Sequence, residues 1–159
     1  MDKEMELVDL KKNYEIVAKQ YGLPDFKTMN EEFEIEKITH ESETLLRAVR
    51  KVILEKILNS MSFLEILLNP VNVPRMYVSF VRGLSADDKK EIDKIYDSFA
   101  ALGLEGLDNE IDYSEKAEAE LIKKCISTWN SIKPEFRKII TNMKKPVVED
   151  VKKERSYYG

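Results

Sequence analysis

The chain has 159 residues, of which 43% are apolar and 35% charged, with five Gly and five Pro. This composition is typical of one soluble helical domain, and it excludes disordered and fibrous proteins. It also excludes a disulfide-rich protein, because Cys125 is the only cysteine. The acidic start disfavours a secretory signal, and the apolar stretch 57–68 is shorter than the roughly 20 residues of a membrane span, so we expect a cytoplasmic protein outside the membrane.

Charge is unevenly distributed along the chain. Residues 1–115 hold 15 Lys and Arg against 24 Asp and Glu, whereas residues 116–159 hold 11 against 6. The basic end has three explanations. The helix dipole favours basic residues near a helix C-terminus, a basic tail can fold back on the acidic body, and basic residues can bind an external polyanion such as a nucleic acid.

The first predicted helix covers 3–21, with Asp2 as its cap and Gly22 as its stop. Pro24 opens a second, short helix over 25–33, followed by an extended link over 35–38. Apolar residues at steps of three and four predict the buried faces of the two helices: Leu7, Leu10, Tyr14, Val17 and Tyr21 in the first, and Leu23, Phe26, Met29 and Phe33 in the second.

The longest predicted helix covers 40–69, with Thr39 as its candidate cap and Pro70 as its end. Its second half, 57–68, is apolar nearly all round, which predicts neighbours on several sides. The main stripe of this helix consists of Leu46, Val49, Ile53, Ile57, Met61, Leu64 and Leu68.

Three short stretches of this N-terminal part are YGLPDF at 21–26, EFEI at 32–35 and LLR at 45–47. In these stretches the chain resembles a small all-helical family of archaeal hypothetical proteins. The resemblance implies a helical fold and a cytoplasmic setting. It implies no activity and no catalytic residue.

Residues 69–74 form a connection, and the following run 75–82 has an ambiguous period. It is rich in β-branched and aromatic residues, as in a strand. Only 147–151 could pair with it, however, and an isolated pair of strands is marginal. We therefore predict a short irregular helix over 75–82.

The next predicted helix covers 86–102, with Ser85 and Asp88 as a capping box and Gly103 as its stop. A connection rich in Gly and acidic residues follows, over 104–113. The buried face of this helix is predicted to consist of Ile92, Ile95, Phe99 and Leu102.

The last predicted helix covers 115–144 and contains Pro134. Two helices joined near Ser131 are one interpretation. The apolar period continues in phase across the proline, which favours one helix with a kink, ended by Pro146. Residues 1–145 then form the single domain and 146–159 a C-terminal tail. The apolar stripe consists of Leu121, Cys125, Trp129, Ile132, Phe136, Ile139 and Met143.

Residues with catalytic or metal-binding chemistry are sparse. His40 is the only histidine and is expected at a helix entry or on the surface, although Glu36 or Glu43 could contact it. Cys125 lies in an apolar stripe and is expected to be buried rather than nucleophilic. Glu115 and Glu118 share a helix face, yet no second carboxylate pair is predicted to face them. We assign no catalytic, cofactor-binding or metal-binding residue.

The sequence thus predicts an all-α bundle of four main helices, 3–21, 40–69, 86–102 and 115–144, with a long central helix and a kinked C-terminal helix. The leading hypothesis is a non-enzymatic interaction or assembly module, either a homodimer or bound to another protein. One alternative is nucleic-acid binding, and another is a carboxylate-metal nucleotide hydrolase. The nucleic-acid candidates are Lys133, Arg137, Lys138, Lys144 and Lys145.

Overall fold

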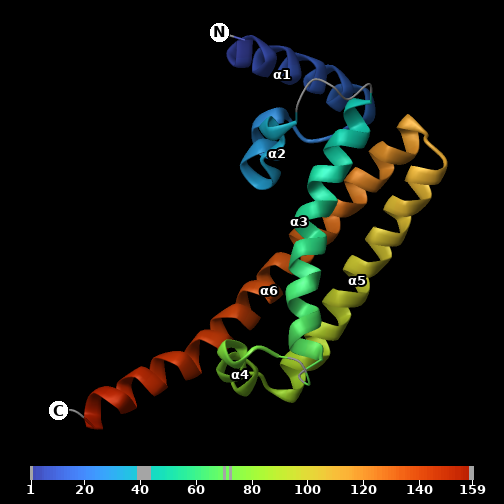
Figure 1. The fold of residues 1–159 in the computed structure, drawn as a ribbon. Coiled ribbons are helices and arrows are strands. Elements are labelled where there is room, and N and C mark those ends of the chain that lie inside the picture. Colours follow the sequence, from blue (N-terminus) through green and yellow to red (C-terminus); the bar gives the residue numbers. More distant parts are fainter. Residues whose placement is uncertain (1, 39–43, 70, 72, 158–159) are drawn as a thin grey trace. The chain divides into compact units, whose positions relative to one another are not determined.

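The computed structural model describes the backbone of residues 2–38, 44–69, 71 and 73–157, and the side chains of 6–38, 44–69, 71 and 73–145. These residues form six α-helices, one 3-10 turn and no strand, so the predicted all-α class is confirmed (Figure 1). The elements are α1 (Asp2–Tyr21), α2 (Phe26–Phe33), η1 (Ile35–Lys37), α3 (Leu45–Leu68), α4 (Arg75–Arg82), α5 (Ala86–Ile111) and α6 (Glu115–Tyr157).

The chain divides into two compact units. The first consists of Met1–Leu58 and Ala101–Ser127, and the second of Asn59–Ala100 and Thr128–Gly159. Each of the helices α3, α5 and α6 has one part in the first unit and its other part in the second.

The N-terminal hairpin of the first unit is formed by α1 and α2. Gly22 adopts a φ of +69°, a conformation that costs glycine little and that ends α1 where the sequence predicts. The Tyr14 hydroxyl donates a hydrogen bond to the Pro24 carbonyl (2.8 Å), and the backbone N–H of Phe26 donates one to Glu15 Oε1 (2.9 Å). Asp25 caps α2 by accepting from the N–H of Thr28, so the short predicted helix is confirmed.

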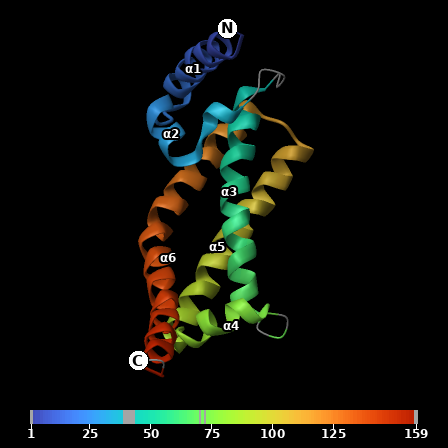
Figure 2. The same cartoon turned by 60° about the vertical axis from the view of Figure 1, so that its left-hand side comes forward.

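The rest of the first unit brings the first half of α3 beside the end of α5 and the start of α6, as both views show (Figures 1 and 2). The predicted buried faces of α2 and of this part of α3 are confirmed. On α1 the prediction is confirmed for Leu10 and Tyr14, but Val17 and Tyr21 are only partly buried. It is wrong for Leu7, which is 40% exposed. The largest buried side chains of this unit include Tyr14, Met29, Ile35, Leu46, Ile53, Ile57 and Ile122.

The second unit contains α4, which confirms a helix over the ambiguous run 75–82. Tyr77 of α4 makes edge-to-face contacts with Phe63 of α3 and with Phe80, yet no residue of α4 is buried. The predicted capping box is confirmed, because Ser85 Oγ accepts from the Asp88 N–H and Asp88 Oδ2 from the Ser85 N–H, both at 3.0 Å. The core of this unit consists of Leu64, Leu67, Leu84, Ile92, Ile95, Phe99, Trp129, Ile139 and Met143.

Two predicted helix ends are wrong. Helix α5 continues through Gly103 and Gly106 to Ile111, so the connection predicted over 104–113 is mostly helix. Helix α6 is continuous across Pro134, as the unbroken apolar period predicts. It does not end near residue 145, however, but continues past Pro146 to Tyr157. The division into a 1–145 domain and a tail stays a prediction.

Two smaller differences concern the segment before α3. The link predicted to be extended over 35–38 contains the 3-10 turn η1. Helix α3 begins at Leu45 rather than near residue 40. Thr39 and His40, the candidate cap and the only histidine, lie outside the described residues.

A membrane span is not found among the described helices, because none combines the length and the apolar character that crossing a bilayer requires.

Candidate interaction surface on α5

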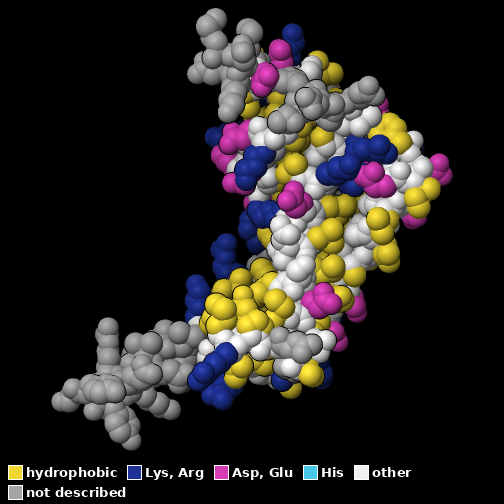
Figure 3. All heavy atoms as spheres, viewed as in Figure 1, with side chains coloured by type: hydrophobic (Ala, Val, Ile, Leu, Met, Phe, Trp, Pro, Cys, Tyr) yellow, Lys and Arg dark blue, Asp and Glu magenta, His cyan; other side chains and the backbone are white. Residues whose placement is uncertain are grey.

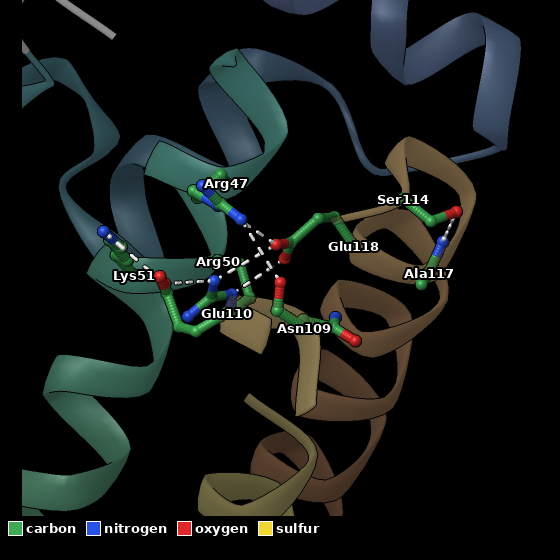
Figure 4. A network of polar contacts seen from close by, with 8 residues as sticks. All are labelled: Arg47, Arg50, Lys51, Asn109, Glu110, Ser114, Ala117 and Glu118. Carbon is green, nitrogen blue, oxygen red and sulfur yellow. Dashed lines mark hydrogen bonds and ion pairs between the residues drawn. The ribbon is translucent and has the colours of Figure 1, made fainter. Parts of the chain in front are cut away.

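A buried ion network joins three helices of the first unit. Arg50 of α3 donates from Nε to Glu118 Oε2 of α6 (2.7 Å), and from Nη2 to Glu118 Oε1 (3.1 Å) and Glu110 Oε1 of α5 (2.7 Å) (Figure 4). The side chains of Arg50 and Glu118 are only 4% and 0% exposed. A buried charge costs several kcal/mol unless it is paired and hydrogen-bonded. The two-point contact of Arg50 with Glu118 supplies that pairing.

Further cations surround the same carboxylates. Arg47 Nη2 donates to the backbone carbonyl of Asn109 (3.3 Å), and Arg47 Nε lies 3.8 Å from Glu118 Oε1 without a hydrogen bond. Lys51 Nζ lies 3.5 Å from Glu110 Oε1. In this network α3 therefore supplies three cations, whereas α5 and α6 supply one carboxylate each. The hydrogen bond from Arg50 holds the pKa of Glu110 below its usual range.

The same network holds the end of α5 and the start of α6 against α3. The Arg47 guanidinium lies 4.8 Å from the ring centre of Tyr113, in the short connection between those helices. Ser114 then starts α6 by accepting, through Oγ, from the N–H of Ala117 (3.4 Å). We infer that this network fixes the direction in which the last turns of α5 run.

Two glycines allow α5 to lie close to α3. A Cβ atom at Gly106 would lie 2.5 Å from Leu54 Cδ1, and one at Gly103 would lie 3.2 Å from Leu58 Cδ2. The side chain of Leu54 therefore occupies space that any other residue at position 106 would need. These glycines act as packing positions inside the helix, whereas the sequence predicted a stop at Gly103 and a connection at Gly106.

Another, neighbouring face of this part of α5 is apolar and exposed. Leu104 is 66%, Leu107 61% and Ile111 82% exposed, and their spacing of three and four residues places them on one helix face. Figure 3 shows hydrophobic side chains along this part of α5. Isolated exposed apolar residues are ordinary, but three in one row form a continuous patch. We call Leu104, Leu107 and Ile111 the α5 stripe.

An open cleft of about 530 Å³ lies beside α5 and α6 in the first unit. Its lining charges are paired, Lys124 with Glu105 (2.7 Å) and Lys123 with Glu120 (3.3 Å). A ligand entering the cleft would have to compete with these pairs, so we do not place the functional site here.

The residues singled out in the sequence are separated in the structure. Glu118 is buried against arginines, whereas Glu115 is exposed, so this pair does not form a site for a divalent cation. No group of three or more His, Cys, Asp or Glu side chains suited to a metal ion occurs in the described part of the chain. Cys125 is fully buried, as predicted.

The nucleic-acid candidates all lie on the part of α6 that belongs to the second unit. Lys133 is half-buried, and the other four are exposed. Figure 3 shows Lys and Arg side chains along one side of α6. Lys138 attracts the Asp88 carboxylate, whose pKa is lowered chiefly by its hydrogen bond from the Ser85 N–H, with further lowering from Ser85 Oγ, Asn142 and Lys138. Whether these residues bind nucleic acid stays a prediction.

The environment of Cys125 gives a testable expectation. Burial, with a smaller contribution from the Glu105 carboxylate, raises the pKa of its thiol to about 12. Because the thiolate is the reactive form, native protein at about pH 8 should not react with Ellman's reagent, whereas protein in concentrated guanidinium chloride should give one thiol per chain. Rapid labelling of the native protein, at the rate of glutathione, would contradict this burial.

Comparison with protein-family models, with curated proteins and with solved structures finds no match for this chain. The archaeal resemblance therefore stays an expectation.

Neither the Arg50 network nor the α5 stripe was predicted from the sequence. The continued spacing of Leu104, Leu107 and Ile111 was a signal for the longer helix. Arg50 and Lys51, three and four residues after Arg47, were a signal for a charged helix face.

Proposed function

We propose that the protein is a non-enzymatic helical interaction module that binds a protein partner through the α5 stripe. The observation that carries this proposal is the row of three exposed apolar side chains on one face of α5. Burying such side chains against a partner is favourable by roughly 25 cal/mol per Å² of apolar surface removed from water.

The support behind the stripe strengthens the proposal. The Arg50 network and the close contact at Gly106 hold a neighbouring face of the same helix segment. A surface held in its binding geometry loses less conformational entropy on association than a mobile one. The stripe is therefore suited to act as a preformed docking face.

The fold that we propose for this module is one bundle of the four long helices α1, α3, α5 and α6, with a kink in α6 at Pro134. The continuity of α3, α5 and α6 through both units supports it, and a proline inside a helix removes a backbone hydrogen bond. We place the module in the cytoplasm, where the single buried thiol would stay reduced.

A photo-crosslinking amino acid tests the interaction directly. Benzoylphenylalanine at Leu107 of the full chain, expressed in cells, should give one discrete crosslinked product after irradiation. Adding Ile111→Asp should remove that product, because it places a charge in the stripe at a position 82% exposed in the free chain. Benzoylphenylalanine at the exposed Lys90 is the control and should give no such product. Equal products from both positions, or none from Leu107, would overturn the proposal.

Nucleic-acid binding is the second candidate, favoured by the exposed Arg137, Lys138, Lys144 and Lys145 on α6. If it is correct, a fluorescent duplex or single strand should bind with an affinity that falls steeply with salt. The double variant Lys144→Glu and Lys145→Glu should weaken binding at least tenfold, about the effect of losing two phosphate contacts, in fluorescence anisotropy. Affinity independent of salt, or unchanged in the variant, would contradict this function.

A further inference from the structure

The exposed face of α1 has side chains complementary to those of the α5 stripe. Val8 and Ile16 are 65% and 58% exposed, and the exposed Lys12 lies midway between them in the sequence. Steps of four residues place all three in one row along the helix. The opposite face of α1 carries the buried Leu10 and Tyr14, so this row is directed away from the core of the first unit.

A charge of the opposite sign lies on α5 between two residues of the α5 stripe. Asp108 follows Leu104 by four residues and precedes Ile111 by three, and it is exposed. Within the described part of the chain, neither Asp108 nor Lys12 forms an ion pair. Both rows thus have the order apolar, charged, apolar. At 1.5 Å per residue, successive positions are roughly 6 Å apart, except Asp108 and Ile111, which are roughly 4.5 Å apart.

Both rows belong to the first unit, and both are exposed in the single chain. They therefore do not cover each other within one molecule. A second copy of the chain offers each row its complement, and a two-fold arrangement forms both contacts at once. This doubles the apolar surface buried and pairs Lys12 with Asp108 twice.

We infer that the partner of the α5 stripe is the Val8, Lys12 and Ile16 face of α1 in a second copy, in a two-fold symmetric homodimer. The inference rests on the proposed function, because it identifies the partner that the α5 stripe binds. Apolar contact supplies most of the affinity, whereas the charge pair sets which helix faces meet.

Charge reversal tests this pairing in sedimentation velocity on the full chain. Wild-type protein should pass from 18.5 kDa towards twice that mass as its concentration rises. Lys12→Glu or Asp108→Lys alone places like charges at both contacts, and each should raise the dimer dissociation constant by about tenfold or more.

Mixing the two single variants gives the decisive result. In a mixed dimer one contact is wild-type and the other is charge-reversed on both sides, so the dissociation constant should return to within about threefold of wild type. The double variant on one chain should return in the same way. Matched controls are Lys90→Glu and Asp87→Lys, both at exposed positions elsewhere on α5, and they should leave the dimer unchanged.

Several results would overturn the inference. These are a wild-type monomer at all concentrations, a dimer insensitive to either single variant, and single variants that weaken the dimer without recovery on mixing. Far-UV circular dichroism and thermal unfolding of every variant show whether it is folded. A crosslink from Leu107 to a different protein would also refute the homodimer, yet it would leave the proposed interaction function intact.

Discussion

Replacing Glu118 with leucine is expected to lower the free energy of unfolding by about 3–5 kcal/mol, the largest effect that we anticipate for a single substitution in this protein. Glu118 is fully buried and accepts two hydrogen bonds from Arg50, whose side chain is only 4% exposed. Without Glu118, the Arg50 guanidinium keeps only Glu110 as a carboxylate partner and stays out of water. Urea denaturation followed by far-UV circular dichroism measures the loss.

The double variant Arg50→Met and Glu118→Leu is the control. It removes both buried charges, and replacing a buried ion pair by apolar residues is often nearly neutral. We therefore expect it to recover at least half of the loss. A cost of about 1 kcal/mol or less for Glu118→Leu would match a solvent-exposed ion pair and would contradict the burial of this network.

Gly106→Leu is expected to cost about 1–3 kcal/mol, the usual penalty for forcing extra atoms into a packed interior. A Cβ atom at this position would already lie 2.5 Å from Leu54 Cδ1, and the Leu54 side chain is buried. Leucine has a far higher helix propensity than glycine, so any loss of stability must come from packing between α5 and α3. The measurement is again chemical denaturation.

Two related variants test whether the loss of stability comes from the contact with α3. Gly103→Ala places a Cβ atom 3.2 Å from Leu58 Cδ2, and a small shift of that side chain should keep its cost well below that of Gly106→Leu. Adding Leu54→Ala to Gly106→Leu removes the clashing atoms and should recover part of the loss. A stabilising Gly106→Leu would show that α5 does not approach α3 closely here.

Glu118→Leu and Gly106→Leu are also expected to affect the interaction surface. Glu118→Leu removes a partner of Arg50, which also contacts Glu110 of α5. Gly106→Leu acts on the face of α5 that packs against α3, whereas the stripe is exposed. If that support preforms the stripe, each variant should weaken association as well as stability. Charge reversal at Lys12 or Asp108 should weaken association alone, because both positions are exposed.

The amphipathic pattern of the sequence determined the helical class and several buried faces. Leu23, Phe26, Met29 and Phe33 are all buried, as their spacing predicts. The capping box at Ser85 and Asp88 and the αL position at Gly22 also follow from local chemistry. Such features depend on neighbours within about four residues along the chain, so the sequence alone contains the needed information.

Only the tertiary structure decided that Gly103 and Gly106 are helix-packing positions and that Arg50 is buried. A glycine after an apolar face is equally consistent with a helix end and with close helix packing, and the atoms that distinguish the two belong to α3, about fifty residues away in sequence. Arginine is ordinarily a surface residue, and its burial at position 50 depends on carboxylates contributed by α5 and α6. The exposure of Leu104, Leu107 and Ile111 likewise follows from which face of α5 meets α3, because one helix alone cannot specify which of its faces a distant segment will cover.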